Sequence, residues 1–218
     1  MKTSLPEQIV RRSIFLQHDA EYFDSLFEHD DDPWLFKSRW YESRKRALTL
    51  ACLPQSRYAS GYEPGCANGE LSATLASRCD HLLVTDGSAI AVAMASARLA
   101  EYTNVTVRIA WVPEQWPTDT FDLIVLSEFG FYLNARSLQG IAEHAVRSLR
   151  HGGTIVACHW RRPIAGCEFN GDEVHHMLFE KMSQLTALTQ VCQLIEPDMR
   201  LEVWSVDPRS VAQREGFA

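Results

Sequence analysis

Two glycines four positions apart, Gly65 and Gly69, stand in the segment GYEPGCANGELSATLA behind the carboxylate of Glu63. Glycine adopts backbone conformations closed to other residues, and it leaves main-chain N–H groups accessible at the start of a helix. The dinucleotide fingerprint G-x-G-x-x-G needs a glycine where this chain has Ala67, and the P-loop needs a Gly-Lys-Ser/Thr that is missing. The loop therefore matches neither of these motifs, and a purely structural turn is the alternative to a ligand-binding loop.

A second carboxylate, Asp86, ends the predicted strand HLLVTD, 21 residues after Gly65. At this position a carboxylate can accept hydrogen bonds from both hydroxyls of an adenosine ribose. Dehydrogenases share this feature, and the structural alternative is an N-cap for the helix that begins near Ser88. Asp86 thus predicts an adenosine-containing ligand without saying what its reactive group is.

Side chains that could move a proton stand at the ends of two later strands. Glu128 closes the apolar run FDLIVLSE beside Ser127, Tyr132 lies on the following turn, and His159 closes GGTIVACHW. Carboxylates and imidazoles are common general bases, which makes Glu128 the first candidate and His159 the second. The structural alternatives are a helix cap or an ion pair with an arginine of the N-terminal segment for Glu128, and a buried structural role for His159.

The elements that position these residues alternate along the chain. Five apolar strands are predicted at residues 59–64, 81–86, 105–110, 121–128 and 152–160. Helices are predicted at residues 6–28, 39–53, 69–78, 88–101, 136–150 and 171–188. This order predicts an α/β, Rossmann-like, doubly wound and mostly parallel sheet. Two further runs, TQVCQLI and RLEVWSV around EPDM, predict an antiparallel hairpin at its C-terminal edge.

The 218 residues, 46% of them hydrophobic, predict one globular unit at 59–218 preceded by a helical lead-in or lid at 1–58. A net charge of −7 without a basic block disfavours nucleic acid as a partner. No signal peptide and no run of about 18 apolar residues is recognisable, so we expect a cytoplasmic protein without membrane contact. The cysteines form no C-x-x-C pair and His175, His176 and Asp172 no metal constellation, so no metal is expected.

The pattern E-x-G-x-x-x-G resembles motif I of the Rossmann-like S-adenosylmethionine (SAM) methyltransferases. The segments FDLIVLSE and SLRHGGTIVAC resemble the fourth strand of that class and the Gly-Gly turn before its fifth strand. More specifically, DDPWLFKSRWYESRKRALTLACLP, EPGCANGELS, FDLIVLSEFGFYL and ACHWRRP resemble the NodS-like methyltransferases over residues 20–206. That family is named for a nodulation N-methyltransferase that acts on the deacetylated amino sugar of a chitin oligosaccharide.

The resemblance implies SAM as cofactor and methyl transfer to a small-molecule or carbohydrate acceptor, with nitrogen favoured over oxygen as the methylated atom. In that reading the glycine loop lines the methionine, Asp86 holds the ribose and Trp111 flanks the adenine. The residues implied for the cofactor are Trp34, Arg44, Glu63, Gly65, Cys66, Ala67, Gly69, Asp86, Trp111, Val112 and Ser127. The structural alternatives are core packing for Trp111 and a solvated basic helix face for the lead-in.

Methyl transfer from a sulfonium is an in-line displacement in which positioning is the main catalytic task. An amine acceptor is mostly protonated at neutral pH, so a base must take its proton. Glu128, with His159 and Tyr132, is predicted for this catalytic role, and Tyr41, Arg161 and His175 are predicted to contact the acceptor.

Two other functions fit part of the pattern, and the oligomeric state stays open. A nicotinamide-dependent oxidoreductase would share Asp86, but Ala67 replaces the middle glycine and the chain has the length of one domain. A noncatalytic nucleoside-binding module would keep the sheet without its chemistry. Gly65, Asp86 and Glu128 together favour the methyltransferase.

Overall fold

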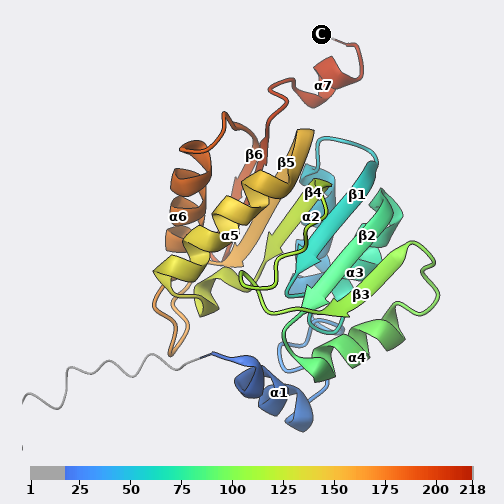
Figure 1. The fold of residues 1–218 in the computed structure, drawn as a ribbon, viewed down its shortest axis with the longest axis vertical. Coiled ribbons are helices and arrows are strands. Elements are labelled where there is room, and N and C mark those ends of the chain that lie inside the picture. The colour runs from blue at the N-terminus through green and yellow to red at the C-terminus, as the bar shows by residue number, and fades with distance from the viewer. Residues whose placement is uncertain (1–17, 218) are drawn as a thin grey trace, which may run out of the picture.

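The computed structural model describes residues 18–217, in which seven strands form one sheet with helices on both faces (Figure 1). The strand order is β3-β2-β1-β4-β5-β7-β6, and β1 to β5 are mutually parallel while β7 runs antiparallel to β5 and β6. The strands are β1 (Tyr58–Pro64), β2 (Cys79–Asp86), β3 (Val105–Ile109), β4 (Phe121–Ser127), β5 (Leu149–Trp160), β6 (Thr189–Ile195) and β7 (Met199–Ser205). The predicted Rossmann-like sheet with an antiparallel edge hairpin is confirmed.

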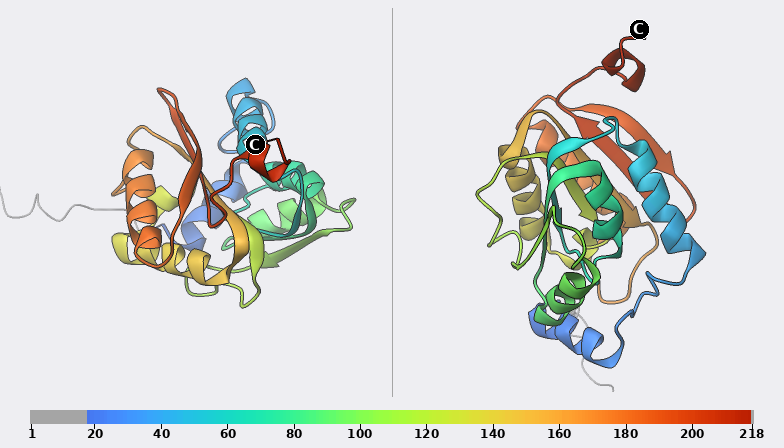
Figure 2. Two further views of the ribbon diagram at one scale, coloured as in Figure 1. Left: turned by 90° about the horizontal axis from the view of Figure 1, so that it is seen from above. Right: turned by 90° about the vertical axis from the view of Figure 1, so that its right-hand side faces the viewer.

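The helices form two layers (Figure 2), with α2, α3 and α4 over one face of the sheet and α5 and α6 over the other. The helices are α1 (Ala20–His29), α2 (Trp40–Cys52), α3 (Glu70–Leu75), α4 (Ala89–Arg98), α5 (Ala135–Ser148), α6 (Gly171–Ser183) and the short α7 (Val211–Arg214). Single 3-10 turns, η1 (Ala76–Arg78) and η2 (Gly130–Tyr132), follow α3 and β4.

Local signals explain most helix boundaries. Asp19 caps α1 through the Tyr22 N–H, so the predicted helix 6–28 starts later within the described residues, and its part at 6–17 lies outside them. The side chains of Asn170 and Glu173 form a capping box at the start of α6. This helix ends at Ser183 rather than at 188. Helix α7 was not predicted, and the predicted helix 69–78 is divided into α3 and the 3-10 turn η1.

The core has one layer on each side of the sheet, which explains why the central strands are apolar without alternation. Along β4, Leu123 and Val125 pack with α3 and α4, while Ile124 and Leu126 face α5 and α6. All four side chains are at most 1% exposed. The site residues at the strand ends therefore stand on a rigid floor.

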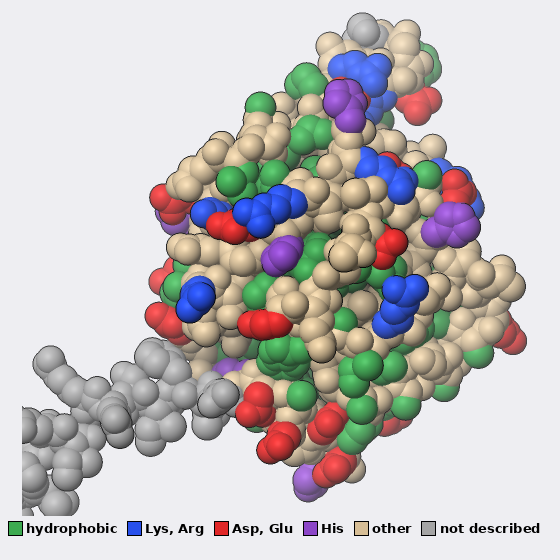
Figure 3. Space-filling model, viewed as in Figure 1, with side chains coloured by type: hydrophobic (Ala, Val, Ile, Leu, Met, Phe, Trp, Pro, Cys, Tyr) green, Lys and Arg blue, Asp and Glu red, His purple; other side chains and the backbone are tan. Residues whose placement is uncertain are grey.

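Within residues 18–217, no helix is both long and apolar enough to cross a bilayer. The same residues contain no group of three or more His, Cys, Asp or Glu side chains placed to hold a metal ion. All six cysteines are free thiols. On the face drawn in Figure 3, acidic side chains gather at the end of the molecule where α1 lies. The exposed acids of this segment are Glu21, Glu28, Asp30 and Asp31.

Candidate functional site

A cavity of about 410 Å³ lies at the carboxyl ends of the parallel strands. The lead-in between His18 and Lys45 forms one wall, and the loops that follow β1 to β5 form the other. The predicted site residues that line it are Trp34, Tyr41, Gly65, Ala67, Asp86, Trp111, Val112, Ser127, Glu128 and Tyr132. Those that do not are Arg44, Glu63, Cys66, Gly69, His159, Arg161 and His175.

The two motif glycines have different tasks. Gly65 has φ +71° and lines the cavity, and a Cβ there would lie 3.3 Å from Cδ1 of Phe129. Gly69 has φ +82° at the start of α3, where a Cβ would lie 3.2 Å from Cα of Ala95 on α4. The missing side chain of Gly69 therefore lets α3 approach α4, and its contact with the cofactor stays a prediction.

Asp86 joins the end of β2 to the glycine loop on the cavity floor. Its two oxygens accept hydrogen bonds from the N–H groups of Ala67 and Ser88, both at 2.9 Å. Burial raises the pKa of Asp86, against the effect of these two N–H donors. A carboxylate oxygen has two lone pairs, so each oxygen keeps one acceptor site. Ser88 itself caps α4 through the Ala91 N–H, so Asp86 is not the N-cap.

Two predicted cofactor residues turn away from the main cavity. The Glu63 carboxylate is 2% exposed and accepts a 2.6 Å hydrogen bond from the Ser72 hydroxyl, and burial raises its pKa to about 8. The Cys66 thiol is 4% exposed and packs in the core beside α3. Both residues line a smaller cavity of about 50 Å³ that shares Gly65 and Ala67 with the main one.

Glu128 belongs to a buried ion cluster that the sequence did not reveal. Lys45 Nζ lies 2.6 Å from Glu128 Oε1 and 2.8 Å from Glu42 Oε2, and the Trp160 N–H donates to Glu128 Oε2 at 2.9 Å. Burial alone would lower the pKa of Lys45, but the two carboxylates hold it above its ordinary value. The expected ion pair with the N-terminal segment is thus present, with a lysine in place of an arginine. In the sequence, the only feature that points to this ion cluster is the spacing of Glu42, Lys45 and Thr49, which places them on one face of α2.

The prediction that His159 reaches the crevice is wrong. His159 and His175 are 0% exposed and lie behind the turn that follows β4. His159 Nε2 accepts the Gly130 N–H at 3.2 Å, and its Nδ1 lies 3.1 Å from His175 Nε2. Neither ring can act as a base on a ligand in the cavity or contact an acceptor there.

Two predicted arginines also point elsewhere, because acidic partners near the β6–β7 turn hold them. Arg44 makes a hydrogen bond of 2.7 Å to Glu196 Oε2, and not to a cavity ligand. Arg161 binds the Asp172 carboxylate at 2.8 Å and the Glu196 carbonyl at 2.5 Å. Arg39 of the lead-in lines the cavity instead.

Aromatic rings make up much of the remaining wall. Tyr41 meets Trp160 edge-on at 5.6 Å between ring centroids, and Tyr132 meets Phe23 edge-on at 5.1 Å. The aromatic lining residues that sequence reasoning missed are Phe23, Phe27, Phe36, Phe129, Phe131 and Trp160. They are spread over the lead-in and two strand ends, so no local spacing marks them as one surface.

Trp111, the predicted adenine contact, packs against a further glycine, Gly87. A Cβ on Gly87 would lie 2.1 Å from Cε3 of Trp111, so only glycine lets the indole lie on the turn after β2. Trp111 therefore both packs on this turn and lines the cavity.

The lead-in is tied to the glycine loop through Asp32, which is 7% exposed. Its carboxylate accepts the N–H groups of Phe36 at 2.8 Å and Lys37 at 2.9 Å, and the Asn68 side-chain amide at 3.1 Å. These bonds close the segment DDPWLF over the cavity edge.

Known proteins resemble this chain in sequence and in structure. The sequence profile of the Nodulation protein S (NodS) family matches residues 23–169. Nodulation protein S of Rhizobium tropici is 29% identical over 128 residues, which are 58% of this chain and 54% of that protein. The chain thus spans about half the length of the curated relatives that it matches.

Two solved structures share the fold. A Pseudomonas syringae protein described as a proposed methyltransferase is 46% identical, with a TM-score of 0.68 over 77% of this chain and 99% of that one. The N-methyltransferase NodS from Bradyrhizobium japonicum WM9, solved with S-adenosyl-L-homocysteine (SAH), is 24% identical with a TM-score of 0.74 over 85% and 97% of the two chains. The NodS family profile matches residues 23–169, which are well over half of this chain, and the chain therefore belongs to the NodS family.

Proposed function

We propose that this protein is a SAM-dependent methyltransferase that methylates an amine nitrogen of a small-molecule or carbohydrate acceptor. The observation that carries this proposal is the cavity of about 410 Å³ between the glycine loop, Asp86 and the aromatic lead-in. Its volume lies in the range of small-ligand sites. Membership of the NodS family supports the reaction type, and Ala67 in place of a middle glycine disfavours the nicotinamide alternative.

The residues present fit the cofactor. Asp86 keeps one acceptor site on each oxygen for the ribose hydroxyls, and Gly65 and Gly87 line the cavity without a side chain. Trp111 offers an apolar face for the adenine. Bound SAM supplies an electrophilic methyl group on a sulfonium. The chain then has to orient the acceptor, exclude water and accept one proton.

We infer that Glu128 orients the acceptor amine and takes its proton. Lys45 and the Trp160 N–H fix its carboxylate, and each oxygen retains one lone pair for an N–H of the acceptor. Burial raises the pKa of Tyr132, so its hydroxyl stays neutral and acts as a hydrogen-bonding group at the same wall. His159 takes no part as a base because it is buried behind this wall.

The acceptor side of the cavity favours a cationic or sugar-like molecule. Rings such as Tyr41 and Trp160 bind amines through cation–π contacts and provide flat surfaces for sugar rings. The acidic segment around α1 attracts positive charge toward the same end of the molecule. Six free thiols fit the reducing cytoplasm that we propose as its location.

Calorimetric titration tests this function directly. Purified protein should give heat with SAH and none with NADH; heat with NADH alone would overturn the proposal. Transfer of a labelled methyl group from SAM to a panel of amino sugars and small amines then identifies the acceptor. On any accepted amine, Glu128→Gln should abolish most turnover, and unchanged turnover would remove Glu128 as the base.

A further inference from the structure

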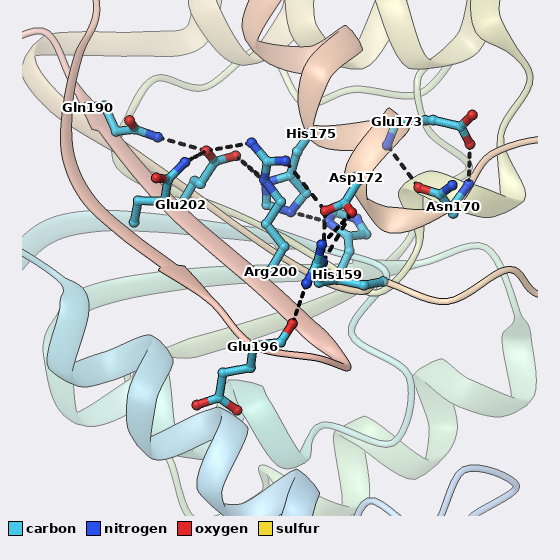
Figure 4. Close-up of polar contacts among 11 residues, drawn as sticks. His159, Asn170, Asp172, Glu173, His175, Gln190, Glu196, Arg200 and Glu202 are labelled. Carbon is cyan, nitrogen blue, oxygen red and sulfur yellow. Dashed lines mark hydrogen bonds and ion pairs between the residues drawn. The ribbon is translucent and has the colours of Figure 1, made fainter.

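A line of buried hydrogen bonds runs from the turn after β4 to the antiparallel edge of the sheet, and Figure 4 shows its part from His159 to Glu202. The Gly130 N–H meets His159 Nε2 at 3.2 Å, His159 Nδ1 lies 3.1 Å from His175 Nε2, and His175 Nδ1 lies 2.7 Å from Glu202 Oε2. The two rings are 0% exposed and Glu202 is 3% exposed. The line joins η2, β5, α6 and β7, four elements that are distant in sequence.

The first bond fixes the direction of all the others. A backbone N–H can only donate, so Nε2 of His159 is an acceptor without a proton. The proton of this neutral ring is then on Nδ1, which donates to His175 Nε2. His175 in turn carries its proton on Nδ1 and donates it to Glu202. Every ring nitrogen is used once, and burial lowers the pKa of both histidines, which favours these neutral forms.

The far end of the line is a fixed negative charge. Glu202 also accepts hydrogen bonds from Arg200 at 2.9 and 3.0 Å, and from the amides of Gln190 and Gln193, each at 2.7 Å (Figure 4). Burial alone would raise the pKa of Glu202, but the bonds from His175, Arg200 and Gln193 hold it well below its ordinary value. The carboxylate thus sets the orientation of both imidazoles from the edge of the sheet.

The near end of the line holds a strained turn in the cavity wall. Glu128 has φ +59°, a conformation that residues other than glycine rarely adopt. Three consecutive residues of β5 hold this turn. The Cys158 carbonyl accepts the Glu128 N–H at 3.0 Å, His159 accepts the Gly130 N–H, and the Trp160 N–H donates to the Glu128 carboxylate.

A shift of this turn would reach the proposed cofactor site as well as Glu128. Phe129, between Glu128 and Gly130, lies against Gly65, where a Cβ would be only 3.3 Å from its ring. The side chain of Val174 on α6 covers Gly130 from behind, and a Cβ on Gly130 would lie 2.5 Å from it. His159 is the side chain that bonds the middle of the turn.

We propose that His159 and His175 are positioning residues, oriented from Glu202, which hold the Glu128–Tyr132 turn in the shape that the cavity needs. The choice of SAH as the test ligand depends on the function proposed above, but the chain of hydrogen bonds does not. No step of the reaction passes through either ring. Their effect reaches the cavity through the Gly130 N–H.

Two amide variants test the hydrogen bonds of the two His159 ring nitrogens one at a time. His159→Gln places an amide oxygen near the former Nε2, where it can still accept the Gly130 N–H. His159→Asn places an amide near Nδ1, where it can reach His175 but not Gly130. His176→Gln is the matched control, because this neighbour of His175 on α6 has a side chain that is 78% exposed.

We expect His159→Asn to weaken SAH binding about tenfold in calorimetry and to speed amide exchange at Gly130 at least as much, the effect of losing one buried hydrogen bond. His159→Gln should restore both values to within about threefold of those of His176→Gln. Equal losses in the two His159 variants, or none in either, would overturn the proposal.

Two further readouts keep the test decisive. If the unaltered protein gives no heat with SAH, the proposed function fails, and amide exchange at Gly130 alone decides the positioning role. If both His159 variants fail to fold, ring ¹⁵N spectra of the unaltered protein decide it. A proton on Nδ1 of both rings supports the line of bonds, and a proton on Nε2 of either ring overturns it.

Discussion

Replacing Lys45 by methionine perturbs the ion cluster in the cavity wall at one point. The Lys45 ammonium lies 2.6 Å from Glu128 and 2.8 Å from Glu42, and its side chain is only 7% exposed. Methionine keeps most of the volume and removes the charge, so Lys45→Met leaves two neighbouring carboxylates whose side chains are 9% and 18% exposed. Two neighbouring carboxylates with so little exposure to water cannot both stay ionised without a large cost in free energy.

The expected loss is large for one substitution. Removing one partner of a buried ion pair costs about 3–5 kcal/mol, from a total stability of roughly 5–15 kcal/mol. In a chain of this length, each kcal/mol lowers the melting temperature by about 2–4 °C. We therefore expect Lys45→Met to melt about 6–20 °C below the unaltered protein at pH 7. Scanning calorimetry measures the shift, and urea unfolding measures the free energy of unfolding.

Acidification should restore part of this loss. Burial already raises the pKa of Glu42 beside Lys45, and without the ammonium the Glu42 carboxylate takes up a proton more readily. The destabilisation is thus greatest near neutral pH and shrinks as the pH falls toward 4.5. Lys37→Met is the matched control, since Lys37 pairs with Asp31 at 2.7 Å on the exposed surface. A loss no larger than that of the control, or one independent of pH, would refute the assigned cluster.

Three other predictions concern the cofactor floor and the buried histidines. Asp86→Ala should weaken SAH binding by about 1–3 kcal/mol in calorimetry, and unchanged affinity would exclude a ribose contact. Glu63 lines the smaller cavity beside the glycine loop, and burial raises its pKa to about 8, so an SAH ammonium that enters this cavity should make Glu63 release close to one proton at pH 7. Titrations in phosphate and in Tris measure this release, which Glu63→Gln should remove. Burial lowers the pKa of His159 and His175 below 6.5. As the pH falls, these two histidines therefore bind protons in the unfolded chain before they do so in the folded protein. The free energy of unfolding should thus fall as the pH drops below about 6.5. In His175→Gln this slope, measured by urea unfolding between pH 7 and 5, should be shallower.

Local pattern was enough to predict the sheet and the floor of the cavity. Parallel strands buried on both faces are continuous apolar runs, so FDLIVLS and TIVAC mark β4 and β5 without any knowledge of their neighbours. Gly65 and Asp86 could be placed together because the carboxyl ends of parallel strands meet at one edge. Both lie on the cavity floor, as the topology requires.

The errors arose where tertiary packing decides which way a side chain points. His159 follows Ala157 on the face of β5 that α6 covers, so its ring points into that layer rather than along the strand toward the cavity. From the sequence alone, Lys45 belongs to a solvated basic helix face. Only the fold shows that α2 buries its side chain beside Glu128. Glu196, which binds Arg44, is 152 positions away along the chain, and no local spacing predicts such a pair.

A crystal structure of the protein with SAH would show whether the cavity binds the cofactor as proposed. We predict that the adenosine lies in the cavity between the glycine loop and the lead-in, with its adenine against Trp111 and both ribose hydroxyls about 3 Å from Asp86. The sulfur should face the Glu128 turn. A nucleoside bound elsewhere, or an Asp86 carboxylate that still bonds only the N–H groups of Ala67 and Ser88, would contradict it.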